Sequence, residues 1–150
     1  MSYDLTALVG HPEALARIRH RAVTHRPVPL IDGIALVPLP GDELAEAVDI
    51  HPYRIDDVTT ELGPAIAFAS MAGPVAFIHI ASFGGTADEA VAVWRDGELV
   101  WQARAEDLDQ ERLSAEALRL VGVVAAPGSD EFDTLGLGRH RETEDWIARS

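Results

Sequence analysis

The sequence predicts a single α+β domain, residues 1–150, with a mostly antiparallel sheet of about five or six strands and helices packed against it. Three observations predict this fold class. Short apolar runs alternate along the chain with segments of helical periodicity. Asp-Gly pairs at residues 32–33 and 96–97 each separate two apolar runs, which is a hairpin signal. The length of 150 residues and the 47% hydrophobic content suffice for one buried core.

The first 26 residues predict a strand followed by a helix. "SYDLTALV" alternates so that Tyr3, Leu5 and Ala7 share one strand face. In "HPEALARIRHRAVTHR", residues 11–26, Pro12 suits a first helical position. Leu15, Ile18 and Ala22 then form an apolar stripe at helical spacing.

Residues 27–74 predict a hairpin, two helices and a loop. The prolines that bracket residues 27–40 indicate short or edge strands. Residues 41–49 predict an acidic helix, whose early Asp42 suits the helix dipole. "HPYRIDDVTTELG", residues 51–63, is polar and predicts a loop. Pro64 is then expected to open a buried helix that Gly73-Pro74 ends.

Residues 75–105 predict a strand, a break at Gly84-Gly85 and a hairpin. With Asp96-Gly97 as a type I′ turn, the expected pairs are Arg95–Glu98, Trp94–Leu99 and Ala92–Trp101. Both faces of this hairpin are apolar, so we expect it to be central and covered on each side.

The C-terminal third predicts helices joined by a glycine-containing loop. "SAEALRLVG" predicts a helix that Ser114 caps and Gly122 ends. Residues 130–134 are expected to form one helical turn. A last helix is expected from about Glu142 to Arg149.

The charge of the chain is acidic and unevenly distributed. The net charge is −13, while the first 26 residues hold four arginines against two acids. A phosphate backbone would be repelled by most of this surface, so we expect no nucleic-acid binding. The chain has no cysteine, no apolar run long enough for a membrane span and no basic leader. We therefore expect a cytoplasmic location and no membrane association.

Familiar catalytic and metal-binding patterns are absent from the sequence. The six histidines show no ligand spacing, and Ser70 lacks the G-x-S-x-G pattern of a nucleophile elbow. No phosphate-binding glycine loop is present either. We expect no metal and no cofactor, and an enzyme is the less favoured of the two functional classes. His79 is a single exception, because it shares a strand face with apolar residues and is either a core histidine or a base beside a cleft.

"LGLGRHRETEDW", residues 135–146, places Arg139, His140 and Arg141 before the expected last helix. Three interpretations are open. The arginines pair with nearby acids and clamp the last helix, or they hold an anion at a helix start, or His140 is catalytic. Arg139→Ala separates the first from the second, since it destabilises the fold only if the residue is a clamp.

The segments "MAGPVAFIHIASFGGTADEAVAVWRDGELV" and "DEFDTLGLGRHRETEDW" together resemble a family of uncharacterised small proteins from GC-rich bacteria. Some similar sequences resemble immunity partners of bacterial toxins, which implies a protein-binding role. The chain departs from the family pattern at four positions. His79 and Ala81 stand where acids are expected, and Ala87 and Glu89 stand where a glycine and a glutamine are expected.

Two functional hypotheses follow. The first is an immunity-like acidic protein that neutralises a basic, toxin-like partner. Its candidate contacts lie in two acidic segments: Asp56, Asp57, Glu61, Asp130, Glu131 and Asp133. The second is a small enzyme or ligand-binding protein with a pocket beside the central hairpin, formed by His79, Arg139 and His140. The apolar segment 28–39 also leaves a homo-oligomer open.

Overall fold

The computed structural model describes residues 2–83, 86–105 and 113–147. Six strands form one sheet in the order β2-β3-β1-β4-β5-β6, and every neighbouring pair is antiparallel. The strands are β1 (Ser2–Gly10), β2 (Val28–Pro29), β3 (Ala35–Pro38), β4 (Val75–Phe83), β5 (Thr86–Arg95) and β6 (Glu98–Ala105). The predicted α+β fold is confirmed.

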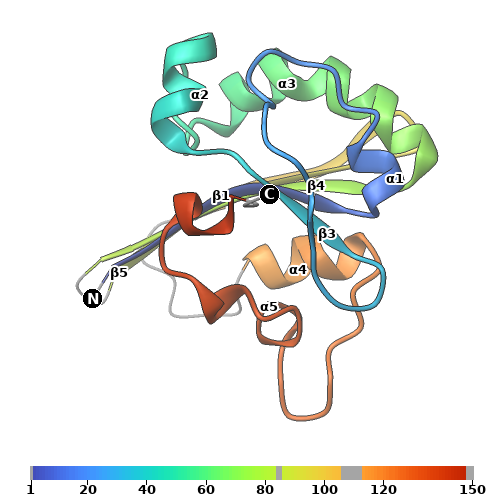
Figure 1. The fold of residues 1–150 in the computed structure, drawn as a ribbon, viewed down its shortest axis with the longest axis vertical. Helices are drawn as coiled ribbons and strands as arrows, with labels where there is room; N and C mark the ends of the chain where they lie inside the picture. Colours follow the sequence, from blue (N-terminus) through green and yellow to red (C-terminus); the bar gives the residue numbers. More distant parts are fainter. Residues whose placement is uncertain (1, 84–85, 106–112, 148–150) are drawn as a thin grey trace.

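Helices cover both faces of the sheet (Figure 1). One face carries α1 (Pro12–Leu15), α2 (Gly41–Val48), α3 (Ile55–Ala69) and the 3-10 helix η1 (Ser70–Ala72). The other carries α4 (Leu113–Leu120), α5 (Glu131–Thr134) and the 3-10 helices η2 (Leu137–Arg139) and η3 (Thr143–Trp146). The central strands β1 and β4 therefore contribute to two cores. On β1, Leu5 and Ala7 face the α4 side, and Leu8 faces the α3 side.

The helix α3 corrects the predicted loop at residues 51–63. It begins at Ile55 and runs through Pro64, which was expected to open it. The reason is an apolar stripe at helical spacing that packs on the sheet: Ile55, Val58, Leu62, Ile66 and Ala69. Pro64 lies on the exposed side, where the cost of its missing N–H is outweighed by this burial. The helix is not buried all round, since Phe68 is 65% exposed.

The helix expected over residues 11–26 is much shorter in the structure. α1 ends at Leu15, although Ile18 and Ala22 are buried as their spacing predicts. One competing contact is local: the backbone N–H of Ala22 donates to Nδ1 of His20 instead of a helical carbonyl. The apolar spacing therefore predicted burial correctly but not helix length.

Both Asp-Gly turns are confirmed. Asp32 and Gly33 have φ of 56° and 75°, and Asp96 and Gly97 have 54° and 85°. Positive φ at both central residues is the requirement of a type I′ turn. The edge position expected for the proline-bracketed hairpin is also confirmed, because β2 is an outer strand.

The register of the second hairpin is partly wrong. Arg95–Glu98 and Trp94–Leu99 pair as expected, but a β-bulge follows and Trp101 pairs with Val93. Trp101 therefore lies on the α4 face of the sheet, not opposite Ala92. β5 is covered on both sides as expected, whereas β6 is an edge strand with Val100 46% exposed.

The C-terminal elements also differ in part from expectation. Ser114 lies inside α4 and does not cap it. The turn at 130–134 is confirmed, with the Asp130 carboxylate accepting the N–H of Asp133. The expected last helix is the short η3 within the described chain, and Ile147 is already extended. Residues 148–150 and the Gly84-Gly85 break lie outside the described residues.

The C-terminal segment completes the hydrogen bonding of β1. β3 pairs only with residues 7–10 of β1, which leaves its first half open at that edge. There the N–H of Asp4 donates to the carbonyl of Arg141 at 2.7 Å. The N–H of Thr6 donates to Oγ1 of Thr143 at 3.1 Å, and that hydroxyl donates to the carbonyl of Asp4. This pairing satisfies buried backbone groups and brings Glu142 beside Asp4.

Candidate functional site

A cleft of about 540 Å³ opens between the α2–α3 connection and strands β1 and β4. Its volume is within the usual range for small-ligand sites. Six lining residues supply most of its chemistry: Asp4, Thr6, Asp49, His51, Asp57 and His79. The strands fix the floor, and the residues that join the two helices form one wall.

The floor of the cleft is a hydrogen-bonded pair of buried side chains. Thr6 and His79 are register partners on β1 and β4, and Oγ1 of Thr6 lies 2.8 Å from Nδ1 of His79. Only 1% of Thr6 and 4% of His79 are exposed. Burial, and secondarily the neighbouring His51, lowers the pKa of His79 from 6.5 to about 4. His79 is therefore neutral at physiological pH.

The wall of the cleft holds a second imidazole. The rings of His51 and His79 meet edge to face with centroids 5.8 Å apart. Nδ1 of His51 accepts the backbone N–H of Tyr53 at 3.0 Å, which orients the ring. The guanidinium of Arg104 lies over the Tyr53 ring, 4.8 Å from its centroid, so β6 supports this wall.

Negative charge gathers at the mouth of the cleft. Asp4 is an exposed residue whose pKa is raised by partial burial and by the carboxylates of Glu142 and Glu144. His51 opposes this shift. The mutual repulsion of these carboxylates means that a cation would be stabilised here.

The geometry does not suit nucleophilic catalysis by Thr6. A hydroxyl within 3 Å of an imidazole is the spacing of a nucleophile and its base. Thr6 is however almost inaccessible, and an imidazole with a pKa near 4 is a weak base at neutral pH. No group of three or more potential metal ligands occurs among the described residues. Thr6 and His79 are therefore poorly placed to act as a nucleophile and its base.

The structure does not place His79, Arg139 and His140 in one pocket. His79 lines the cleft, which lies over β1 and β4 and not beside the β5–β6 turn. Arg139 and His140 instead contact Trp146, which is buried in the core on the other face of the sheet. The predicted pocket of these three residues is thus wrong, although His79 alone does line a cleft.

The C-terminal segment is not held by the ion pairs that were predicted for Arg139 and Arg141. Arg139 and Arg141 form no ion pair within the described part of the chain. The Arg139 guanidinium lies 5.6 Å from the ring centroid of Trp146, and the His140 ring meets the same ring edge to face at 4.7 Å. The segment around η3 is therefore held by aromatic packing and by its backbone pairing with β1.

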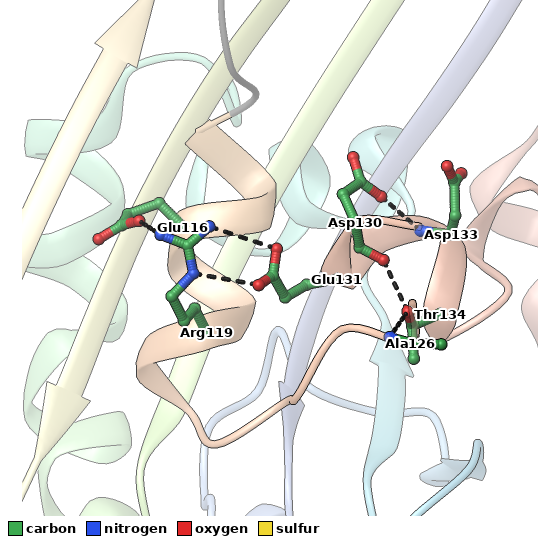
Figure 2. A network of polar contacts seen from close by, with 7 residues as sticks. All are labelled: Glu116, Arg119, Ala126, Asp130, Glu131, Asp133 and Thr134. Carbon is green, nitrogen blue, oxygen red and sulfur yellow. Dashed lines mark hydrogen bonds and ion pairs between the residues drawn. The ribbon is translucent and has the colours of Figure 1, made fainter. Parts of the chain in front are cut away.

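Glu131 binds Arg119 of α4 (Figure 2) and is an internal residue, not a surface contact. Its side chain is 8% exposed, and Oε2 accepts Nε–H of Arg119 at 3.0 Å. The hydrogen bond from Arg119 lowers the pKa of Glu131 against the opposing effect of burial. Asp130 is engaged in capping α5, while Asp133 is exposed.

Arg119→Ala is expected to lower the free energy of unfolding by about 2 kcal/mol, because it leaves the buried carboxylate of Glu131 without its counter-charge. Urea denaturation at pH 7 measures this change. Glu116→Ala is the matched control, since Glu116 binds the same guanidinium but is 40% exposed. That change is expected to cost less than about 0.5 kcal/mol. Equal effects of the two substitutions would contradict the conclusion that Arg119 compensates the buried charge of Glu131.

The acidic candidates on α3 fall into two groups. Asp57 lines the cleft. Asp56 accepts a hydrogen bond from the Gln102 amide at 3.2 Å, and Glu61 lies 3.4 Å from Nε2 of His20. All three acids are exposed, but only Asp57 contributes to the cleft.

Sequence reasoning missed Asp4, Thr6, Asp49 and His51 as site residues. A signal for the first two was present, because they are polar residues on one face of an otherwise apolar strand. Asp49 and His51 could be placed only once α3 had replaced the expected loop.

Comparison of the chain with family models, curated proteins and solved structures finds no match. Fold and site therefore define the class: an antiparallel six-stranded sheet covered by helices on both faces, with a polar cleft against its central strands. The resemblance to small proteins of GC-rich bacteria stays a prediction. No helix in the described ranges is long and apolar enough to cross a bilayer.

Proposed function

We propose that this chain is a cytoplasmic, immunity-like binding protein whose cleft receives a basic side chain of a partner protein. The observation that carries the proposal is the charge of the cleft. Asp4, Asp49 and Asp57 line it together with Arg54, so carboxylates exceed the guanidinium. A lysine or arginine from a partner would find compensating charge on several sides.

The electrostatics of the mouth favour a cation further. Partial burial, and then the carboxylates of Glu142 and Glu144, raise the pKa of Asp4, so ionised Asp4 is held at a cost in the free protein. A bound guanidinium or ammonium group would offset the repulsion among these carboxylates and gain hydrogen bonds.

The neutral floor is compatible with the same ligand. Because the pKa of His79 is about 4, its imidazole adds no positive charge near pH 7. The net charge of −13 would also increase the rate at which a basic partner arrives. Binding should accordingly weaken as salt is raised.

Asp4→Asn is expected to weaken binding of a tetra-arginine peptide about three- to tenfold, the scale of one lost charged contact. The same substitution is expected to stabilise the free protein at pH 7 by a few tenths of a kcal/mol, because it relieves an exposed like-charge contact. Calorimetric titration and urea denaturation measure the two effects. Opposite signs in binding and stability are typical of a residue kept for binding.

Glu98→Gln is the matched control, because it removes one exposed carboxylate from the β5–β6 turn, outside the cleft. It is expected to change peptide affinity less than twofold at moderate salt. If Glu98→Gln weakens binding as much as Asp4→Asn, the peptide responds only to overall charge. That result, or no binding of the peptide at all, would reject the proposal.

A further inference from the structure

The cleft carries an arginine on its wall among several carboxylates. Arg54 lines it together with Asp4, Asp49 and Asp57. This arginine is exposed and directly precedes α3. A ligand group that is only cationic is attracted by the carboxylates but repelled by the guanidinium. The mixed lining therefore fits a ligand group that carries both signs of charge.

The two signs of charge are unevenly placed across the cleft. Asp4 lies on β1, beside Glu142. Arg54 and Asp57 also line an adjoining depression of about 250 Å³ that reaches Arg104 of β6. Strands β4 and β5 separate β1 from β6. The side toward β1 is thus acidic, whereas the side toward β6 holds two guanidinium groups beside its carboxylates.

The start of α3 fixes the backbone that carries Arg54. The N–H of Arg54 donates to the carbonyl of His51 at 2.9 Å, and its own carbonyl accepts the N–H of Asp57 at 3.0 Å. A cation and an anion therefore stand one helical turn apart on the same wall. A wall that is already ordered lowers the entropic cost of binding a ligand with two charges.

We propose, as a specification that rests on the proposed function, that the cleft receives the C-terminal residue of its partner, an arginine or lysine with a free carboxylate. The carboxylate accepts hydrogen bonds from the Arg54 guanidinium, whose planar fork matches it. The basic side chain extends toward Asp4. Capture of a C-terminal carboxylate is a recurring mode of peptide recognition. An internal arginine or lysine brings no carboxylate and would leave Arg54 facing a like charge.

Two forms of tetra-arginine, the free acid and the C-terminal amide, test this by calorimetric titration. The amide carries one more positive charge, so attraction to a protein of net charge −13 would by itself favour the amide. We expect the opposite order, with the free acid bound about three- to tenfold more tightly, the scale of one charged contact. An amide that binds as tightly as the free acid, or more tightly, would overturn the inference.

Arg54→Gln removes the guanidinium from the wall and leaves the carboxylates in place. We expect this variant to bind the free acid about three- to tenfold more weakly and the amide no more weakly, so that the preference disappears. Arg17→Gln is the matched control, because Arg17 is an exposed arginine that does not line the cleft. It is expected to keep the preference. A preference for the free acid that survives Arg54→Gln would overturn the role of Arg54.

The outcomes distinguish this inference from the proposed function. If neither peptide binds, the proposed function is rejected and the inference with it. If both peptides bind equally and Asp4→Asn weakens both, only the inference is overturned. The cleft would then receive a basic side chain regardless of its position in the partner.

Discussion

Trp146→Ala is expected to lower the free energy of unfolding by about 3–5 kcal/mol, the cost of emptying a buried tryptophan site. Trp146 is 2% exposed and packs in the core on the face of the sheet that α4 covers. It also holds Arg139 and His140, the segment that precedes the pairing of residues 141–143 with β1. The expected loss of stability therefore includes both the packing of Trp146 and the attachment of residues 139–143 to β1.

Two variants separate packing from charge at this position. Trp146→Phe keeps most of the apolar contact, and no described residue accepts a hydrogen bond from Nε1 of Trp146, so it should cost less than half as much. Arg139→Ala should cost only about 0.5–1 kcal/mol, the scale of an exposed cation–π contact. Urea denaturation of the three variants gives the ranking. A larger effect for Arg139→Ala than for Trp146→Ala would restore an ion-pair clamp as the explanation.

Local sequence chemistry predicts some of these elements well. Asp32-Gly33 and Asp96-Gly97 predict their turns because few other dipeptides tolerate positive φ at both positions. Strand β4 and helix α2 follow from apolar periodicity and from clear end signals. Where one short-range interaction decides the conformation, the sequence is sufficient.

The predictions of secondary structure and register are wrong where tertiary packing decides the conformation. Pro64 is locally a start signal, yet the buried stripe of α3 extends the helix through it. The bulge that moves Trp101 to the other face of the sheet has no local signal in the turn itself. His79 could be recognised as unusual from the sequence, but its neighbours Thr6 and His51 follow from strand order and from α3.

The polar residues of β4 and β5 lie on different faces of the sheet although the two strands are paired. Adjacent positions on paired strands point to opposite faces, so His79 and the residue Ile80 beside it serve different cores. The partner of Ile80 on β5 is Glu89, which therefore faces away from the cleft. Two buried polar residues of one strand pair, His79 and Glu89, can thus lie on opposite faces of the sheet.

The stability of the protein is expected to fall by up to about 3 kcal/mol through His79 alone as the pH is lowered from 7 to below 4. The pKa of His79 is about 4 in the fold against an ordinary 6.5, so the unfolded chain binds the proton more tightly. The stability that neutral His79 contributes is complete above pH 6.5. It is lost progressively as the pH falls from 6.5 through 4. Carboxylates titrate in the same range, so a variant is needed to isolate this contribution.

His79→Gln keeps a polar partner for Thr6 but cannot be protonated, so its stability should depend less on pH than that of the original chain. The stability difference between the two proteins, measured by urea denaturation, should shift by about 3 kcal/mol between pH 7 and 4 in favour of the variant. NMR titration of the His79 ring should give a midpoint near 4. His51 and Asp4 line the same cleft. A midpoint near 6.5 would mean that water and solvent ions reach the imidazole freely. In that case the floor would be charged in mildly acidic solution, and a cleft that receives a basic side chain would release it there.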